Sequence, residues 1–214
     1  MSRIFISSQA NAILPEYLRE RGHSVSFVKA RAGMNRAIAS HPDIYMCCLG
    51  DTVFHGDPSL LLPSYPGDSI YNGCSTGHFF IHNLNHTAPD LLSAVEKAGQ
   101  TVIHVSQGYS KCNCVVVDEK SIITADKGIE RAAAAAGLEV LPIAKAQVLI
   151  EGYQYGFLGG ASGRVGDEVI FNGDLSQHSD YAAIREFIEN RGLRVVFFRD
   201  YPLTDIGSII EERA

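Results

Sequence analysis

The sequence predicts an α/β fold that closes on itself as a ring of five strand-rich units, each with the order strand, strand, helix, strand. Three observations predict this fold. A helix-to-strand junction recurs along the chain, the spacing of the junctions is nearly constant, and the two chain ends complement each other. Such a pattern is typical of a closed repeat array, in this case an α/β propeller with pseudo-fivefold symmetry.

The recurring junction is a glycine that ends a helical pattern, followed three residues later by a valine that begins an apolar strand. It occurs at Gly22, Gly99, Gly137 and Gly192. Glycine is favoured there because a left-handed helix C-cap disfavours a Cβ atom. Gly99 and Gly137 are 38 residues apart, and Gly22 and Gly99 are 77 apart, close to twice that spacing. The interval of 55 residues from Gly137 to Gly192 corresponds to one unit with an insertion.

The elements follow from apolar periodicity, turn residues and helix caps. The clearest unit has strands over 114–118 and 121–124, an N-cap at Asp126, a helix over 128–136 and a strand over 140–143. Further helices are expected over 15–21, 89–98 and 179–191, and a short helix or loop over 31–40. Further strands are expected over 3–7, 23–28, 44–49, 52–55, 71–75, 77–82, 101–105, 148–150, 168–171 and 194–198.

The chain ends complement each other. The tail, 205–211, resembles the first strand of a unit that lacks its other parts, and the N-terminal segment has those parts without a first strand. One domain over 1–214 is therefore expected, with units at about 204–214 plus 3–30, 40–71, 72–107, 110–143 and 155–200. In the second unit the proline-rich loop 56–67 replaces the helix. Pairing of the ends would leave no open sheet edge.

Composition excludes several classes of protein. The net charge of −6 argues against binding to nucleic acid or to an anionic membrane surface. The sequence has no apolar run of membrane-spanning length and no signal peptide. Five cysteines, an odd number without paired spacing, indicate free thiols in a reducing compartment, for which the cytoplasm is the default.

The ring of five units resembles the pentein fold of the guanidino-group-modifying-enzyme (GME) superfamily. That group includes arginine deiminases, dimethylarginine hydrolases, amidinotransferases and the ribosome anti-association initiation factor six. The stretches 107–112, 156–163 and 173–178 resemble more closely an uncharacterised bacterial family of this fold. The resemblance covers nearly the whole chain and implies the fold, whereas a shared fold does not determine activity.

The resemblance implies a chemistry that this chain matches only in part. Pentein enzymes use a cysteine thiolate to attack the guanidinium carbon, a histidine as acid and base, and acidic side chains to hold the cation. That cysteine follows a glycine run in the last unit, and the matching place here is Ser162. A serine is far less nucleophilic without a dedicated base, so the usual hydrolase mechanism is not expected.

Candidate site residues lie where the units begin. If these segments line a central channel, Asn72, Cys74, Cys112, Ser162 and Asp205 converge there. Lys111 would lower the pKa of Cys112, which is then an off-pattern nucleophile and should be alkylated faster than Cys114. The alternative for Cys112 is a structural role, and the alternative for Cys114 is a small buried hydrophobic residue. Cys112 and Cys114 would share a strand face and could bind metal, but no partner set with zinc-like spacing follows, so no metal site and no cofactor are predicted.

Histidines and carboxylates complete the candidates. His104 and His178 are the proposed acid–base residues, and Asp174 is a proposed ligand-binding residue near His178. The alternative for each histidine is a hydrogen-bonded structural role. Asp51, Asp57, Asp126 and Asp174 would alternatively cap a turn or helix.

Two functions therefore remain open. The first is a site in the central channel for a small guanidino or amino-acid-like ligand, with Cys-dependent hydrolysis as an extension. The second is a non-catalytic interaction module that resembles the initiation factor. Thiol, histidine and carboxylate groups at a polar channel mouth would favour the first, and a sealed channel with a large apolar patch would favour the second.

Overall fold

The computed structural model describes residues 2–145 and 147–213, so Met1, Ala146 and Ala214 of the predicted domain lie outside the described residues. The described strands form five small sheets. In their pairing order the sheets are β14 (Ile210–Glu212), β1 (Arg3–Ser7) and β2 (Ser24–Val28); β3 (Met46–Leu49) and β4 (Thr52–His55); β5 (Cys74–Ser75), β6 (Phe79–His82) and β7 (Thr101–His104); β8 (Cys114–Asp118), β9 (Ser121–Thr124) and β10 (Glu139–Pro142); and β11 (Ser162–Val165), β12 (Glu168–Phe171) and β13 (Arg194–Val196).

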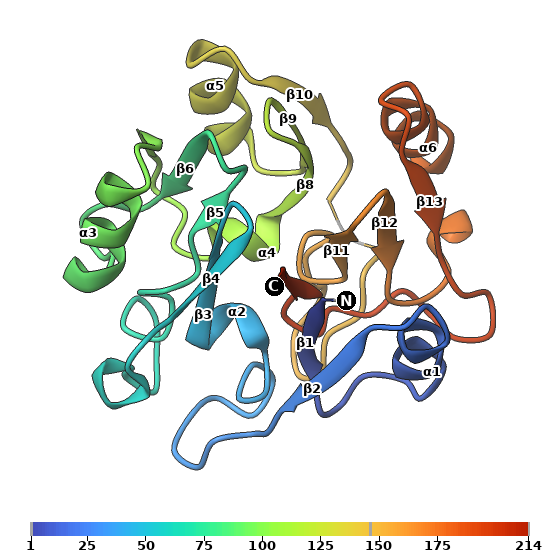
Figure 1. Ribbon diagram of the computed structural model, residues 1–214, viewed down its shortest axis with the longest axis horizontal. Coiled ribbons are helices and arrows are strands. Elements are labelled where there is room, and N and C mark those ends of the chain that lie inside the picture. Colours follow the sequence, from blue (N-terminus) through green and yellow to red (C-terminus); the bar gives the residue numbers. More distant parts are fainter. Residues whose placement is uncertain (1, 146, 214) are drawn as a thin grey trace.

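Four of the sheets share one topology. The inner strand pairs antiparallel with the middle strand, and the middle strand pairs parallel with the outer strand, as in the antiparallel β8–β9 pair and the parallel β9–β10 pair. A helix connects the middle strand to the outer strand, because a parallel pair needs a crossover connection. Figure 1 shows the sheets arranged around a centre, with these helices at the periphery.

The helices are short, and the longest described ones have nine residues. None of the described helices is long and apolar enough to cross a membrane. The crossover helices are α1 (Ile13–Glu20), α3 (Pro89–Lys97), α5 (Lys127–Ala135) and α6 (Tyr181–Glu189). Two one-turn helices, α2 (Pro42–Tyr45) and α4 (Ser110–Asn113), precede the inner strands β3 and β8, and 3₁₀ turns occur at Pro58–Leu60 and Leu175–Gln177.

Helix α5 shows how the sequence specifies a crossover helix. Asp126 is its N-cap, and the carboxylate accepts hydrogen bonds from the backbone N–H groups of Gly128 and Ile129 at 2.8 and 3.0 Å. Such a cap is worth about 1 kcal/mol. Ile129 and Ala133, four residues apart on one face, are buried. The helix ends before Gly137, whose φ of 95° lies in the left-handed region.

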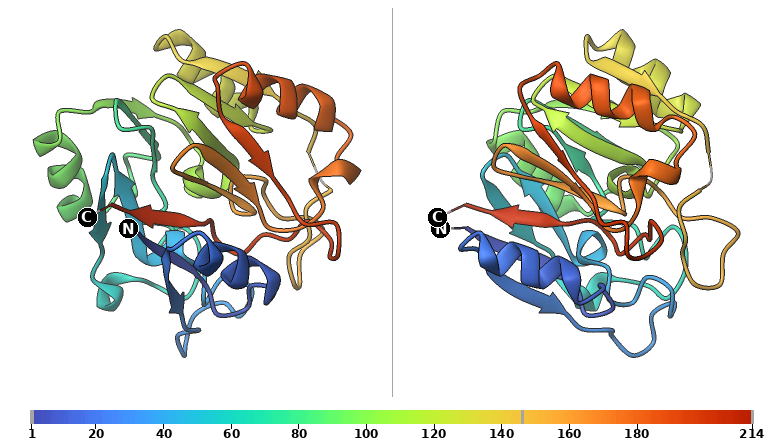
Figure 2. Two further views of the ribbon diagram at one scale, coloured as in Figure 1. Left: turned by 45° about the vertical axis from the view of Figure 1, so that its right-hand side comes forward. Right: turned by 90° about the vertical axis from the view of Figure 1, so that its right-hand side faces the viewer.

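The two ends of the chain form one sheet, as the sequence predicted. Strand β14 pairs antiparallel with β1, with Ile210 opposite Phe5 and Glu212 opposite Arg3. Both views of Figure 2 place the N and C labels side by side. Strands β3 and β4 form a hairpin, and between β4 and β5 the described residues contain only the short 3₁₀ turn Pro58–Leu60 as a helical element.

The structure corrects three local predictions. The strand expected from residue 44 begins at Met46, because His41, Pro42 and Asp43 start helix α2. Only an isolated bridge from Leu149 to Thr204 represents the strand expected at 148–150, whereas the turns at 31–40 agree with the loop alternative given for that segment. Cys112 lies in α4 and not in a strand, so the argument that it shares a strand face with Cys114 does not hold.

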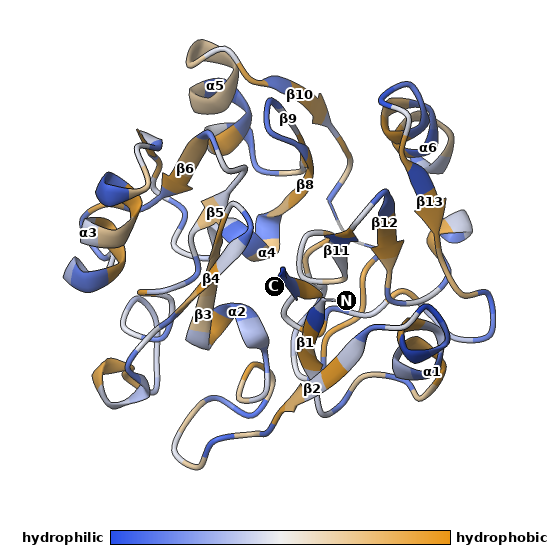
Figure 3. Ribbon diagram, viewed as in Figure 1, coloured by the Kyte–Doolittle hydropathy of each residue, from blue (hydrophilic) through white to orange (hydrophobic). Residues whose placement is uncertain are grey.

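The hydrophobic core is divided among the units. Four clusters of buried apolar side chains lie between the sheets and the peripheral helices, and Figure 3 shows apolar residues along the strands and the inner faces of the helices. Leu91 and Val95 of α3, for example, are completely buried. Burial of each such side chain stabilises the fold by about 1.5–3 kcal/mol. The centre of the ring, by contrast, contains polar and charged residues.

Candidate functional site

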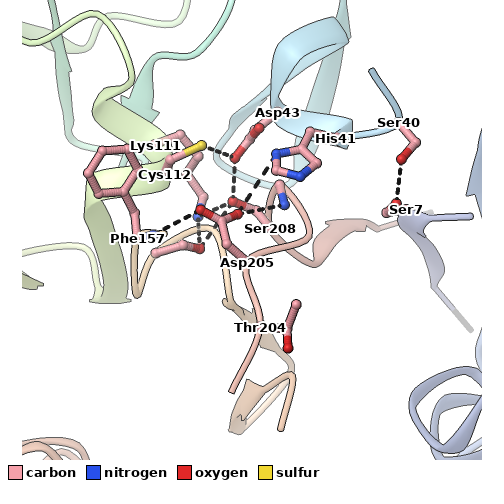
Figure 4. Close-up of polar contacts among 12 residues, drawn as sticks. Ser7, Ser40, His41, Asp43, Lys111, Cys112, Phe157, Thr204, Asp205 and Ser208 are labelled. Atoms are coloured by element: carbon pink, nitrogen blue, oxygen red, sulfur yellow. Dashed lines mark hydrogen bonds and ion pairs between the residues drawn. The ribbon is translucent and has the colours of Figure 1, made fainter. Parts of the chain in front are cut away.

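Polar side chains converge at the centre from segments that directly precede the inner strands. His41 is the N-cap of α2 and Asp43 lies in that helix, Lys111 and Cys112 belong to α4, and Asn72 precedes β5. Asp205 and Ser208 precede β14. We call these seven residues the central cluster, and Figure 4 shows most of them in mutual contact. The sequence predicted Asn72, Lys111, Cys112 and Asp205 at the channel, and it missed His41, Asp43 and Ser208.

The thiol of Cys112 lies between a carboxylate and an amide. Its Sγ donates to Asp43 Oδ2 at 3.0 Å and accepts from Asn72 Nδ2 at 3.3 Å. The residue is 3% exposed. Burial raises the pKa of the Cys112 thiol well above its usual value, and the nearby Asp43 and Asp205 carboxylates raise it further. The thiol is therefore protonated and shielded at neutral pH.

Ser208 connects Asp43 to Lys111. Its hydroxyl donates to Asp43 Oδ2 at 2.7 Å and accepts from Lys111 Nζ at 3.1 Å. The lysine ammonium also lies 3.4 Å from the carbonyl oxygen of Gly159. Ser208 has a φ of 73°, a left-handed conformation that costs a residue other than glycine of order 1–3 kcal/mol. The fold tolerates this conformation at a residue that holds two charged groups together.

Asp205 is anchored by the backbone. Its carboxylate accepts from the N–H groups of Phe157 and Gly207 at 2.9 and 3.0 Å. Burial nevertheless raises the pKa of Asp205 to about 6, although the two N–H groups and Lys111 act in the opposite direction. A Cβ atom on Gly160 would lie 2.1 Å from Asp205 Oδ1, so only glycine fits there. This close approach explains the glycine at 160, and the backbone oxygens of Lys111, Cys112 and Cys114 leave no room for a Cβ atom at Gly159.

His41 is a buried, neutral imidazole. Its Nδ1 lies 3.8 Å from Asp205 Oδ1, and the residue is 2% exposed. Burial lowers the pKa of His41 to about 4, and Asp43 opposes that shift. Burial likewise raises the pKa of Asp43, which His41 opposes. The sequence did not identify His41 as a site residue, because nothing local in His41-Pro42-Asp43 shows that the segment is enclosed.

Two further candidates lie beside the cluster. Ser162 is fully buried, and its hydroxyl donates to the Gly159 carbonyl at 3.3 Å, the same oxygen that faces Lys111. It has no contact with a histidine or a carboxylate among the described hydrogen bonds. Cys74 is also buried, and its thiol hydrogen-bonds to Cys114. Cys74 belongs to an apolar core cluster with Ile81 and Ile122, so it is packed among hydrophobic side chains and does not line the recess.

The remaining candidates lie away from the cluster. His104 is exposed on β7, and its Nδ1 accepts from the backbone N–H of Leu84 at 3.2 Å. Asp174 caps the 3₁₀ turn by accepting from the Ser176 N–H and hydroxyl groups, and those bonds lower its pKa. His178 is buried, and its Nδ1 accepts from the N–H of Asp180 at 3.1 Å. The structure therefore does not bring His104 or Asp174 to Cys112, and it places both in structural hydrogen bonds.

An open recess lies next to the central cluster, on the side of the chain ends. All five sheets contribute to its wall. Its charged lining residues are Asp51, Lys111, Asp118, Glu119, Arg164, Glu211 and Arg213. Arg213 pairs with Asp51 at 2.8 Å, and Arg164 donates to the Val117 carbonyl. Lys111 belongs to both the recess and the cluster, so it connects the two.

A second, smaller pocket lies on the other side of Asp205. Gly156, Phe157, Asp126, Lys145 and His178 are among its lining residues. The backbone of Gly156 separates this pocket from the cluster, because a Cβ atom there would lie 2.6 Å from Asp205 Cβ. His178 therefore faces a pocket, but one that does not contain Cys112.

Comparison with solved structures shows the fold. A dimethylarginine dimethylaminohydrolase, in a histidine-to-glycine variant that forms an adduct with S-methyl-L-thiocitrulline, matches with a TM-score of 0.54 and 11% identity over 92% of each chain. An adduct of this enzyme with 4-chloro-2-hydroxymethylpyridine matches with a TM-score of 0.51 and 12% identity, again over 92% of each chain. The dimethylarginine dimethylaminohydrolase of Pseudomonas aeruginosa, in a cysteine-to-serine variant complexed with citrulline, also matches. Its TM-score is 0.53 and its identity 11%, over 92% of this chain and 91% of that one.

These matches confirm the pentein, or guanidino-group-modifying-enzyme, fold that the sequence predicted. At such low identity they show the fold and carry no catalytic residue over to this chain. A comparison with curated proteins found no match. The model of a family of unknown function, DUF6873, matches residues 52–210, about three quarters of the chain. The protein therefore belongs to the DUF6873 family and has the pentein fold.

Proposed function

We propose that the protein is a five-bladed ββαβ propeller, closed by both termini, that binds a small guanidino or amino-acid-like ligand in its central recess. The observation that carries this proposal is one open recess that is lined by all five sheets and that receives charged side chains from four of them. Four of these side chains are acidic and three are basic. Such a mixed set suits a zwitterion, with the acidic groups around its cation and Lys111 or Arg164 near its carboxylate.

The arrangement favours binding over thiol-dependent hydrolysis. A nucleophilic thiolate must be deprotonated and reach the substrate. The Cys112 thiol is buried, donates to Asp43 and has a raised pKa, and it does not line the recess. The non-catalytic interaction module remains the alternative, but it would require a sealed centre, whereas this recess opens to solvent.

Thermal unfolding with ligands tests the binding proposal. L-arginine, L-lysine and a methylated arginine should raise the melting temperature of the wild-type protein, because a ligand that binds only the folded state stabilises it. The double variant Asp51→Asn/Glu119→Gln should bind the active ligand at least about tenfold more weakly, a difference of about 1.4 kcal/mol. Glu16→Gln, on the exposed outer surface of α1, is the matched control and should bind normally. Absence of a shift with all three ligands would contradict the proposal.

Alkylation tests whether Cys112 is a nucleophile. The sequence alone suggested that Cys112 would react faster than Cys114. Burial raises the pKa of Cys112, while the hydrogen bond to Cys74 and burial raise the pKa of Cys114, so both should react slowly with iodoacetamide at neutral pH. Peptide mass spectrometry after timed labelling measures the two rates, with the unfolded protein as reference. Rapid, selective labelling of folded Cys112 would restore the hydrolase interpretation.

A further inference from the structure

Three buried side chains in the central cluster present metal-binding atoms to one point. His41, Asp43 and Cys112 each offer one donor atom, and the three atoms lie within 4.8 Å of one another. The residues are 2%, 0% and 3% exposed, respectively. In Figure 4 the imidazole of His41 faces Asp43 and Asp205, and Cys112 approaches Asp43 from the other side. The donors come from α2 with its N-cap residue and from α4, which precede strands of two different sheets.

Two polar atoms at this point have no hydrogen-bond partner among the described residues, although they are fully buried. They are His41 Nδ1 and Asp43 Oδ1. A buried polar atom without a partner costs about 1–3 kcal/mol, so a native fold rarely keeps two side by side. His41 Nδ1 lies 3.8 Å from Asp205 Oδ1, too far for a hydrogen bond. That distance is close to the separation of about 3.5 Å between two ligands of a tetrahedral zinc ion.

With Cys112 deprotonated by metal binding, the charges of the cluster would leave a cation to be accommodated. Asp43 and Asp205 are carboxylates, and Cys112 would contribute a third negative charge as a thiolate. Lys111 is the basic side chain hydrogen-bonded in the cluster, through Ser208. Burial of unbalanced charge is costly. A divalent cation would bring the sum of these charges to zero.

We propose that His41, Asp43 and Cys112, joined by Asp205 after a small shift of its carboxylate toward them, bind a divalent transition-metal ion, of which zinc fits best. Mixed nitrogen, oxygen and sulfur donors in a four-coordinate arrangement suit zinc, whereas calcium and magnesium prefer oxygen donors alone. On binding, the Cys112 thiol releases its proton to solvent, and its sulfur forms a bond to the metal in place of the hydrogen bond to Asp43. Four protein ligands leave no open position, so the ion has a structural role at the centre of the ring.

The surroundings of the ligands fit this assignment. Ser208 donates to Asp43 Oδ2, and the N–H groups of Phe157 and Gly207 donate to Asp205. Such outer contacts orient the ligands of metal sites. The sequence predicted no metal site, because only His41 and Asp43 are close together in the chain. The other two ligands follow about seventy and about one hundred and sixty residues later, at no recognisable spacing.

The wild-type protein provides the direct test. Elemental analysis after purification without chelators should find a stoichiometric amount of zinc. Replacement of zinc by Co²⁺ should give the visible absorption of a tetrahedral ion together with a thiolate-to-cobalt charge-transfer band in the near ultraviolet. A wild-type protein that contains no transition metal and gives no such spectrum with Co²⁺ would overturn the proposal, whatever the variants do.

Variants identify the ligands. Cys112→Ser should lose the charge-transfer band, whereas Cys48→Ser, a half-buried cysteine outside the donor set, should keep it. Ser208→Ala retains all four ligands and should bind Co²⁺ about 10–100-fold more weakly. Circular dichroism establishes that each variant is folded. An unchanged band in folded Cys112→Ser would contradict the assignment of the sulfur ligand and with it the site.

Discussion

At the scale of single residues, burial determines the protonation of the polar groups near the centre. Asp205 accepts two backbone hydrogen bonds, which favour its charged form, yet burial raises its pKa to about 6. His82 shows the corresponding effect on a base. Its Nδ1 lies 2.7 Å from the Thr87 hydroxyl, and its Nε2 lies 2.8 Å from the Gly108 carbonyl. The carbonyl requires a proton on Nε2, so the neutral ring satisfies both contacts.

His82 should make the fold sensitive to acid. Burial lowers the pKa of His82 to about 4 from the usual 6.5. The unfolded chain therefore binds a proton below pH 6.5 that the folded chain takes up only near pH 4. The contribution of His82 to the free energy of unfolding is fully present above pH 6.5. About 3 kcal/mol of it is lost as the pH falls from 6.5 to about 4.

The variant His82→Gln removes this proton linkage. Urea unfolding of both proteins at several pH values from 7 to 4 measures the difference. The variant is expected to have a lower stability at pH 7 and a shallower decline toward pH 4. Some decline will remain, because burial also lowers the pKa values of His41 and His178. Identical slopes for the two proteins would show that His82 is not held neutral.

At the scale of elements, each crossover helix ends in a backbone conformation that glycine adopts without strain. Gly22, Gly99, Gly137 and Gly192 have φ values of 83°, 69°, 95° and 72°. A Cβ atom added at any of the four would meet nothing within 4 Å. The requirement for glycine is therefore conformational, and lack of space plays no part in it. This is why the same residue marks every helix-to-strand junction in the sequence.

Gly137→Ala isolates the cost of that conformation. The substitution should destabilise the protein by about 1–2 kcal/mol, because the added Cβ disfavours the left-handed region while no neighbouring atom is displaced. Gly137→Asn should recover part of the loss, since asparagine enters this region more readily. Denaturant unfolding of the three proteins measures both effects. An alanine variant as stable as the wild type would mean that the turn relaxes to another conformation.

At the scale of the whole molecule, one sheet joins the two ends of the chain, because it contains β14 next to β1 and β2. Strand β14 pairs with β1, and Ile210 belongs to the core cluster that also contains Phe5 and Phe80. The closing strand thus contributes hydrogen bonds to β1 and apolar contacts to the neighbouring units. Loss of the contacts that β14 makes should lower the stability of the whole chain, because β1 would become an open sheet edge.

Ile210→Ala tests that contribution. Ile210 is 1% exposed, and truncation of such a side chain typically costs about 2–5 kcal/mol. Thermal and urea unfolding should show a large loss of stability. The exposed neighbouring strand position Thr52→Ala serves as control and should change stability by no more than about 0.5 kcal/mol. A loss below about 1 kcal/mol for Ile210→Ala would show that the fold does not depend on closure by β14.

The sequence by itself determined the repeated elements and the joining of the ends. Glycine C-caps, the Asp126 N-cap and alternating apolar strands act over a few residues, so their chemistry is visible in the chain. It also placed Asn72, Cys112 and Asp205 near the centre, because each directly precedes an inner strand or lies in the segment that leads to one. The one-turn helices α2 and α4 were missed, since four residues are too few to show helical periodicity.

Only the tertiary structure decided which of these polar groups act together. His41 and Asp43 join Cys112 and Asp205 because ring closure brings segments far apart in the chain to one buried point, and no local pattern encodes that approach. The same enclosure sets the pKa values, since burial is a property of the packed molecule. In the folded chain His104 and Asp174 make hydrogen bonds away from the Cys112 thiol. The thiol itself is buried and hydrogen-bonded to Asp43, so it is shielded from solvent.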